Sequence, residues 1–238
     1  MLTILLATLN GSKTLDLFFN SMTKQSYNGE YEIIIVDNGS SDNTKEIVNH
    51  HKSKLPVKYI FHPDKGKNKA LNVGLNHAKG SLIIFTDDDI IPTSNWLKNY
   101  QSCADNNPSY NIFTGHIQPH WEQEPPEWIF RLVSLDVNYA ITDKNQISGP
   151  ITPDKVWGGN MAIRKTFFDQ GYRFIETVGP RPGQYMMGGE TDFIDSNTNI
   201  ALTDKNAYKC WFSDKSIVSH FIEKEQIDPD WLKQRSYH

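Results

Sequence analysis

The sequence has few cysteines, no long hydrophobic run and no excess of positive charge, and each absence argues against a class of protein. Its two cysteines, Cys103 and Cys210, lie far apart and outside any Cys-x-x-Cys spacing. A zinc site or a disulfide framework is therefore not expected, and a reducing compartment is the simplest interpretation. The 24 lysines and arginines stand against 28 aspartates and glutamates, a net charge of −4. This balance lacks the basic footprint of a nucleic-acid-binding protein, so we expect no nucleic-acid partner.

The hydrophobic runs are too short to span a membrane. The apolar start, MLTILLATL, has no basic segment before it and is followed at once by polar residues 10–12. It predicts a first strand instead of a signal peptide or membrane helix, and we expect a cytoplasmic protein. Hydrophobic residues make up 38% of the chain and aromatic residues 12%. This content is sufficient for a packed core and too apolar for disorder.

The first hundred residues alternate between strand and helix patterns. Strands are expected at 3–8, 32–36, 57–61 and 82–85, and helices at 13–24, 45–52 and 70–78. This alternation predicts an α/β fold, with a Rossmann-like, mostly parallel central sheet flanked by helices. After residue 109 the pattern loosens into polar and Pro-rich stretches, and apolar character returns at 156–165 and 207–221. We expect a single domain over residues 1–238, whose second half continues the sheet and carries long loops.

Three consecutive aspartates, Asp87, Asp88 and Asp89, follow the apolar run at 82–85. Unpaired charge is very costly inside a strand, so the chain must emerge at the sheet edge here and meet a cation. The carboxyl end of a strand is where ligands bind in an open α/β sheet, and hard divalent cations prefer oxygen ligands. The cluster therefore predicts a divalent metal that carries a phosphorylated substrate. A solvated turn is the usual alternative for a charge run, but the preceding buried strand disfavours it.

Several motifs occur in a characteristic order. They are TLNGS, EIIIVDNGSSDNT and KNKALNVGLNHAKGSLIIFTDDDIIP within residues 2–98, and VWGGNMAIRK, GGETDF and a late Ser-His-Phe within 156–221. Together they resemble the inverting, family-2-type glycosyltransferases of GT-A fold, densely over the first segment and discontinuously over the second. The resemblance implies that residues 1–108 bind a nucleotide-diphospho-sugar and that residues 109–238 bind a hydroxyl acceptor.

By this resemblance Asp37 binds the nucleotide base, beside Thr8 and Asn10. A carboxylate at a strand end accepts the imide N–H of a base and rejects bases that lack this donor. A UDP-sugar is thus the first guess, although guanine and thymine also carry a ring N–H. The alternative is that Asp37 only caps the following turn, and a structural cap is the role that we expect for Asp42.

The Asp-x-Asp motif of the family falls on Asp87 and Asp89. The resemblance places Asp87 near the ribose or a metal-bound water and makes Asp89 a ligand of Mg²⁺ or Mn²⁺, which neutralises the departing nucleoside diphosphate. Asp88 is expected beside the donor as an added ligand or a hydrogen-bond partner. His220 matches the position of a third metal ligand, with a structural histidine as the alternative.

The resemblance adds further residues on the donor side: Lys67 with its neighbours Lys65 and Lys69, Asn72, Trp157, Gly159 and Asn160. Lys67 would contact base or phosphate, and Asn72 matches the ALNVG pattern of the family. The glycine permits a close approach of the backbone, and Trp157 would stack on a sugar face. Ordinary surface exposure is the alternative for the lysines, and core packing is the alternative for the tryptophan.

An inverting transferase needs a carboxylate that deprotonates the acceptor hydroxyl. The family supplies it from an acidic motif that usually reads Gly-Glu-Asp, and GGETDF departs from this pattern. The two glycines before Glu190 let the backbone approach the substrate, which favours Glu190 as the base. Asp192 is the reserve candidate. The alternative is that both residues only charge a helix N-terminus.

Two other functions compete with sugar transfer. A catalytically silent nucleotide-sugar binding module would keep Asp37 and the metal site without a working base, and the irregular GGETDF motif favours it. A phosphatase of the haloacid dehalogenase type is less well supported, because its nucleophilic aspartate usually follows the first strand. Here the motif follows the fourth strand, and Ile91 stands where that family has threonine or valine.

The acceptor expected from the resemblance is a glycan or a lipid-linked molecule, in polysaccharide or glycoconjugate synthesis. Residues 231–235 have the pattern of a beginning helix. We therefore also consider a native chain that continues past His238 and associates peripherally with the inner face of the membrane.

Overall fold

The computed structural model describes residues 1–177 and 209–236. The first half alternates strands and helices, as predicted. Its elements are β1 (Leu2–Thr8), α1 (Leu15–Met22), β2 (Tyr31–Asp37), α2 (Thr44–His51), β3 (Val57–Phe61), α3 (Lys67–Leu75), β4 (Leu82–Thr86), β5 (Ile90–Pro92) and α4 (Trp96–Asn106). The sequence analysis did not predict β5 and α4, and among the predicted elements α3 is shifted most, beginning at Lys67 instead of residue 70. Gly66, with φ of 141°, makes the turn that starts the helix early.

The second half contains more regular structure than the long loops that the sequence predicts. Its elements are β6 (Ile112–Trp121), α5 (Glu127–Leu132), α6 (Leu135–Tyr139), β7 (Gly149–Ile151), η1 (Pro153–Lys155), β8 (Asn160–Arg164), α7 (Lys165–Asp169), β9 (Cys210–Ile222), η2 (Lys224–Ile227) and α8 (Pro229–Ser236). Strand β6 continues through the exposed residues at 118–120 because each of them pairs with β9. Strand β6 and the short helices α5 and α6 thus occupy part of the second half in which the sequence pattern predicts long loops.

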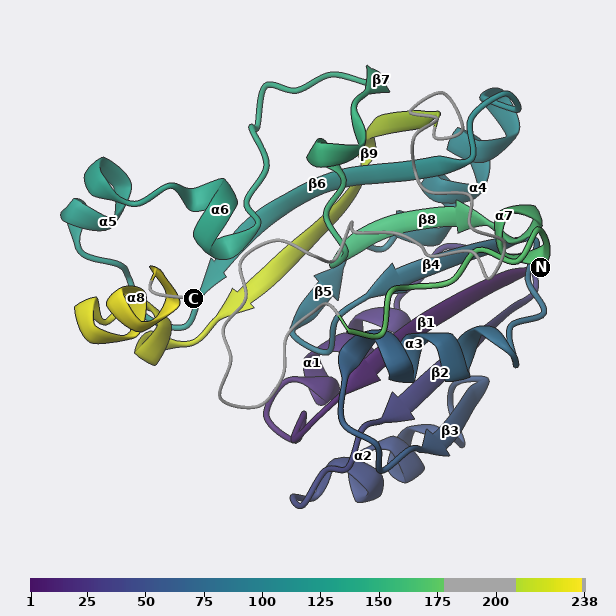
Figure 1. Ribbon diagram of the computed structural model, residues 1–238, viewed down its shortest axis with the longest axis horizontal. Helices are drawn as coiled ribbons and strands as arrows, with labels where there is room; N and C mark the ends of the chain where they lie inside the picture. Colours follow the sequence, from purple (N-terminus) through teal and green to yellow (C-terminus); the bar gives the residue numbers. More distant parts are fainter. Residues whose placement is uncertain (178–208, 237–238) are drawn as a thin grey trace.

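Strands from both halves form one sheet. Within the described residues it has nine strands, in the order β3-β2-β1-β4-β8-β6-β9-β5, with β7 paired to β9. The first four are parallel, and antiparallel pairing begins where β8 joins β4. The predicted α/β architecture with a mostly parallel central sheet is confirmed (Figure 1).

Helices cover both faces of this sheet (Figure 1). On one face α1, α2 and α4 pack against alternate residues of β1, β2 and β4 around the fully buried Phe18, Phe19 and Trp96. On the other face α3 and α7 pack against the intervening residues around Leu71, Phe85 and Phe168. Continuous apolar strands are expected when a sheet is covered on both sides.

A third, smaller cluster joins the far ends of β6 and β9 to α5, α6 and α8, which gather at one side of the molecule in Figure 1. Tyr139 is 1% exposed at its centre and stacks on Trp231 with ring centroids 6.3 Å apart. None of the helices in the described residues combines the length and apolarity that a membrane span needs.

The parallel register brings the polar strand ends to one edge. Thr8 at the end of β1 lies opposite Asp37 at the end of β2, and Leu5 lies opposite Phe85 on the other side of β1. The aspartates after β4 therefore emerge next to Thr8, at the edge where ligands bind in open α/β sheets.

Candidate functional site

The three aspartates at the end of β4 point to different partners. Asp87 Oδ1 lies 2.7 Å from the Nζ atom of Lys67, the first residue of α3. Asp88 Oδ2 accepts a hydrogen bond from the hydroxyl of Thr8. Burial, followed by the charge of Asp89, raises the pKa of the Asp88 carboxyl to about 7. The side chain of Asp88 is thus held against Thr8 at the end of β1, whereas Asp87 contacts Lys67 and Asp89 contacts His220.

Asp89 faces His220 on β9. Asp89 Oδ2 lies 3.2 Å from Nε2 of His220, and the other ring nitrogen, Nδ1, lies 2.7 Å from the carbonyl oxygen of Tyr139. Burial alone would lower the pKa of His220, but the charge of Asp89 and the hydrogen bond to it raise that pKa to about 9. In turn, although burial opposes it, the charge of His220 lowers the pKa of Asp89.

This donor set fits a divalent metal ion. Carboxylate oxygens and an imidazole nitrogen are ligands for Mn²⁺ or a similar ion. A metal-binding histidine usually gives its second ring N–H to a carbonyl or carboxylate, as His220 does to Tyr139. Among residues 1–177 and 209–236, no three acidic, histidine or cysteine side chains are already grouped around a common point. Asp89 and His220 are the pair that could hold an ion, while Asp87 is turned toward Lys67.

Asp37 is only 1% exposed, and its two carboxylate oxygens are already bonded. Oδ1 accepts hydrogen bonds from the backbone N–H groups of Gly39 (3.1 Å) and Ser40 (2.8 Å). Oδ2 accepts one from the hydroxyl of Tyr59 at 2.7 Å. The turn-capping role is therefore present in the structure. An ionised carboxylate has about four lone-pair sites, so Oδ2 retains capacity for a further donor.

The loops after β1 and β2 are joined beside Asp37. Asn10 adopts a left-handed φ of 58°, a conformation that asparagine tolerates better than most residues. Its Oδ1 accepts the N–H of Ser41 (2.8 Å), and its own N–H donates to Oγ of Ser40 (2.8 Å). Asn10 is exposed at the edge of the sheet, whereas Thr8 is 2% exposed beneath it.

Asp42 fastens the same two loops and caps α2. Its carboxylate accepts the N–H groups of Ser12 and Thr44, both at 3.1 Å, together with the hydroxyl of Thr44. Burial opposes the shift, but these hydrogen bonds lower the pKa of Asp42 to about 2. The predicted structural role of Asp42 is confirmed.

We expect Asp42→Ala to lower the free energy of unfolding by about 1 kcal/mol at pH 7, the usual size of a lost helix cap. The folded-state pKa of Asp42, about 2, lies below its ordinary value of 3.8. The stabilisation is therefore complete above the higher value and is lost as pH falls through the lower one. Urea unfolding of both proteins at pH 7 and at pH 3 measures this, and a difference that grows on acidification would contradict it.

Two predicted donor-binding residues make hydrogen bonds within the protein. The side chain of Asn72 donates to the carbonyl of Phe174 and accepts its N–H, both at 2.9 Å. Asn160 is 0% exposed; its Oδ1 accepts the indole N–H of Trp96 (2.9 Å), and its Nδ2 donates to the carbonyl of His116 (3.0 Å). The polar groups of Asn72 and Asn160 are thus bonded within the protein, and their contact with the donor stays a prediction.

Gly159 lies directly beside the acidic cluster. A β-carbon at this position would lie 3.5 Å from Asp87 Oδ2 and 3.4 Å from Ile90 Cδ1. Its carbonyl also accepts the hydroxyl of Thr86 at 3.0 Å, which holds the segment against the end of β4. Trp157 is partly buried and packs against the core, the alternative that the sequence left open.

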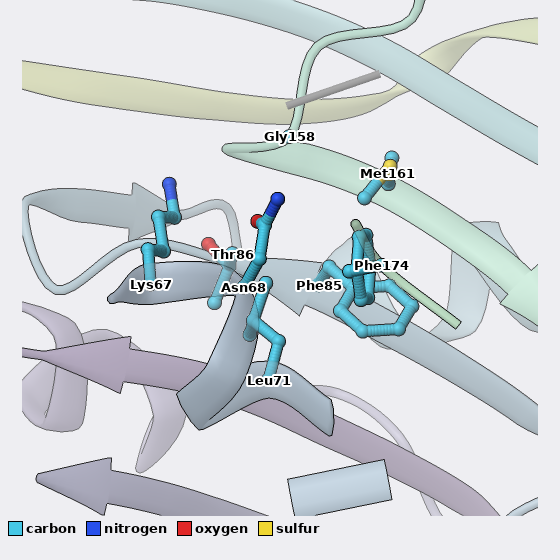
Figure 2. Close-up of a pocket in the computed structure, with 8 residues that line it drawn as sticks. All are labelled: Lys67, Asn68, Leu71, Phe85, Thr86, Gly158, Met161 and Phe174. Carbon is cyan, nitrogen blue, oxygen red and sulfur yellow. The ribbon is translucent and has the colours of Figure 1, made fainter. Parts of the chain in front are cut away.

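Figure 2 shows the hollow between α3 and the start of β8. Lys67 and Asn68 point from the first turn of α3 toward the segment of Gly158. Apolar side chains close the other end: Leu71, Phe85, Met161 and Phe174. The hollow encloses about 10 Å³, close to the minimum for one water molecule. The ammonium group of Lys67 therefore lies next to the acidic cluster, and apolar side chains line the hollow behind it.

A larger hollow of about 170 Å³ lies on the other side of the cluster. Asp88 and Asp89 line it from the turn between β4 and β5, Lys13 from the loop after β1, and Glu223 from the segment after β9. Lys13 Nζ and Glu223 Oε1 lie 3.4 Å apart, so the two segments meet there.

The candidate bases Glu190 and Asp192 lie outside the described residues. Within the described residues, the sequence analysis did not identify two groups that hold the predicted side chains: the hydroxyl of Tyr59, which donates to Asp37, and the backbone carbonyl of Tyr139, which accepts from His220. Neither tyrosine belongs to a motif, and each is separated from its partner by a long stretch of sequence, so composition and spacing carried no signal for them.

Comparison with known proteins decides the family. Residues 3–171 match the sequence model of glycosyl transferase family 2. The chain belongs to glycosyl transferase family 2. It is 30% identical over 205 residues to the glycosyltransferase AglE of Haloferax volcanii, covering 84% of this chain and 62% of that relative. It is 32% identical over 158 residues to a chondroitin synthase of Pasteurella multocida, covering 62% of this chain and 16% of the relative.

Solved structures of glycosyltransferases share the fold of this family 2 chain. The mannosyltransferase PcManGT of Pyrobaculum calidifontis, in complex with GDP-Man and Mn²⁺, superimposes with a TM-score of 0.67 at 19% identity over 100% of this chain and 61% of that one. TarS of S. aureus in complex with UDP-GlcNAc gives 0.64 at 20% identity over 98% and 64%. The predicted family and GT-A fold are confirmed. The match to glycosyl transferase family 2 argues against the phosphatase alternative. The chain spans only 16% to 62% of the length of the two curated relatives named above.

Proposed function

We propose that this chain is the catalytic domain of a metal-dependent glycosyltransferase. It moves a sugar from a nucleotide-diphospho-sugar to a hydroxyl acceptor with inversion. The observation that carries the proposal is the acidic edge of the sheet in a family 2 chain, where Asp87 and Asp89 meet Lys67 and His220. We further propose that residues 1–238 form one domain, in which 1–108 bind the donor and 109–238 the acceptor.

The donor is held by groups at three strand ends. Asp37 accepts the N–H of the base through its remaining lone pair, beside Asn10 and Thr8. Lys67 lies 2.7 Å from Asp87 and supplies a cation for the donor phosphates or for Asp87 itself. UDP is the first choice of nucleotide because a carboxylate suits the imide of uracil. The related structures carry UDP-GlcNAc in TarS and GDP-Man in PcManGT, so guanine is the second choice.

Asp89 and His220 would hold Mg²⁺ or Mn²⁺, with Asp87 nearby, and the bound ion would neutralise charge on the departing nucleoside diphosphate. The residues themselves orient the site. The carbonyl of Tyr139 fixes the ring of His220 so that Nε2 faces Asp89. Asp88, held by Thr8, supports this loop from beneath. Gly159 leaves room beside Asp87 for the donor.

The acceptor hydroxyl is deprotonated by Glu190, with Asp192 as the reserve candidate. The proton passes to the carboxylate as the hydroxyl oxygen attacks the anomeric carbon on the face opposite the leaving group. We propose a glycan or a lipid-linked molecule as the acceptor, because a chondroitin synthase is among the relatives of this chain. The low cysteine content supports a cytoplasmic location, with peripheral membrane association as the alternative.

Hydrolysis and transfer assays test this function. UDP-sugars and GDP-sugars are incubated with the protein and Mn²⁺, with and without EDTA, and release of the nucleoside diphosphate is measured. We expect metal-dependent release for one nucleotide class, faster when a glycan acceptor is present. The irregular GGETDF motif favours a silent binding module as the second candidate. Tight nucleotide binding without turnover of any donor would support that candidate and contradict the enzyme.

The base contact has a conservative test in Asp37→Asn. The amide oxygen of asparagine can still accept from Gly39 and Ser40, so the turn is retained. Its NH₂ group, however, can no longer accept the imide N–H. We expect UDP affinity to fall about tenfold to a hundredfold, the value of one hydrogen bond to a charged group. Titration calorimetry with UDP and CDP measures it, and an unchanged preference for UDP over CDP would contradict the assignment.

A further inference from the structure

Asn38 follows Asp37 at the end of β2 and is bonded to a single loop. It is 5% exposed. Its side-chain Nδ2 donates to the carbonyl oxygens of His62 (3.1 Å) and Asp64 (2.7 Å), and its Oδ1 accepts the N–H of Gly66 (2.7 Å). The loop at residues 62–66 joins β3 to α3. One side chain thus makes three hydrogen bonds to the backbone of this connection.

The side chain of Asn38 holds this loop together with one backbone hydrogen bond, from the N–H of His62 to the carbonyl oxygen of Asp37 at 2.8 Å. Residues 63–65 are exposed and contribute no buried side chain that would anchor the loop by packing. The loop ends at Gly66, and the next residue is Lys67, whose ammonium group lies 2.7 Å from Asp87. Asn38 therefore ties the end of β2, where the base is proposed to bind, to the cation that faces the end of β4.

An amide side chain matches the three backbone groups of this contact. Asparagine offers two N–H donors and one carbonyl acceptor at the same time, which is the set that the three backbone groups need. An aspartate at position 38 would retain an acceptor for Gly66 but would direct a carboxylate oxygen at the carbonyls of His62 and Asp64. Two donors would be lost and two acceptors would be left facing a negative charge in a buried place.

We propose that Asn38 is a positioning residue for donor binding. It holds the loop at 62–66 so that Lys67 stands against Asp87, where the phosphates of a nucleoside diphosphate bind. The inference rests on the proposed function, because it takes this edge of the sheet as the donor site. Asn38 acts through the loop and Lys67 and does not itself contact the donor.

A matched control lies at the other end of the strands, away from the aspartates. Thr3, near the start of β1, is 0% exposed. Its hydroxyl donates to Glu32 and accepts the N–H of Gly80, both at 2.8 Å. Thr3→Val keeps the shape of the side chain and removes two buried hydrogen bonds that join separate segments, as those of Asn38 do. These bonds lie far from the strand ends that carry the aspartates.

The experiment is a double-mutant cycle read out as nucleotide affinity. Titration calorimetry with the best-binding nucleoside diphosphate and Mg²⁺ is performed on the wild type, Asn38→Asp, Lys67→Met, the double variant and Thr3→Val. We expect each single change at 38 and 67 to weaken binding about tenfold, the size of one displaced charge-assisted contact. The double variant should bind no worse than about the weaker single variant, because both changes remove the same contact. Thr3→Val should lower the melting temperature and leave the affinity unchanged.

Two results would overturn the inference alone: Asn38→Asp lowers the melting temperature without changing affinity, or its effect multiplies fully with that of Lys67→Met. If Asn38→Asp does not fold, Asn38→Ala in the same cycle gives the same test, since it removes the clamp without burying a charge. A wild-type chain that binds none of UDP, GDP, dTDP and CDP would overturn the proposed function and the inference with it.

Discussion

Asp89→Asn is expected to reduce metal-dependent sugar transfer about a thousandfold, because it removes an anionic ligand worth several kcal/mol to the charge that develops on the leaving group. The fold should persist. The backbone carbonyl of Asp89 accepts the N–H of Phe221 at 2.8 Å, a bond that the substitution keeps. The rate of nucleoside diphosphate release across a Mn²⁺ titration measures the effect, with circular dichroism as the check on folding.

Asp88→Asn is the matched control for this prediction. It makes the same chemical change one residue away, on a side chain that is directed at Thr8 and not at His220. We expect the rate of sugar transfer to fall by no more than about tenfold, the effect of losing one ordinary hydrogen bond. A larger loss for Asp88→Asn than for Asp89→Asn would show that the ligand was assigned to the wrong aspartate.

The second large effect is expected at the base. Glu190→Gln should lower kcat about a hundredfold to ten thousandfold, the usual contribution of general base catalysis, because glutamine cannot take the proton of the acceptor hydroxyl. Affinity for the nucleoside diphosphate should stay unchanged, since the proposed role of the base is to act on the acceptor. Steady-state transfer kinetics together with calorimetry separate the two quantities.

Asp192→Asn distinguishes the two candidate bases. If Glu190 is the base, the asparagine variant retains most of its rate. A larger loss in Asp192→Asn than in Glu190→Gln would assign the role to Asp192. Full activity in both variants would contradict any role of the GGETDF motif in proton transfer.

The strand-end part of the site was predictable from the sequence because local patterns determine it. An apolar run that stops at a carboxylate marks both the strand and the edge at which it emerges, as at Asp37 and Asp87. The alternation of strands and helices predicts a parallel sheet, whose strands all end at the same edge. The proximity of these residues can therefore be predicted without knowledge of side-chain contacts. The pairing of His220 with the aspartates followed only from the resemblance, since β9 joins the sheet from far along the chain.

Hydrogen bonds between distant segments could not be predicted from the sequence. Asn72 and Asn160 lie in family motifs, but Asn72 bonds to Phe174 and Asn160 to Trp96 and His116, so their roles depend on packing that no short pattern encodes. The same reason explains why Asn38 was not identified from the sequence. Strand β6 was missed because its polar end is held by pairing with β9 and not by its own composition.

The most direct test of the central claim, a metal-assisted donor site at this edge of the sheet, is a thermal-shift panel of UDP, GDP, dTDP and CDP with and without Mn²⁺. Stabilisation follows RT ln(1 + [L]/Kd), so a nucleotide that binds the folded chain raises its melting temperature. We predict that one nucleotide stands apart, with UDP first, and that its shift requires Mn²⁺ and is lost in Asp89→Asn. Equal shifts for all four nucleotides, or a shift indifferent to the metal, would contradict the account.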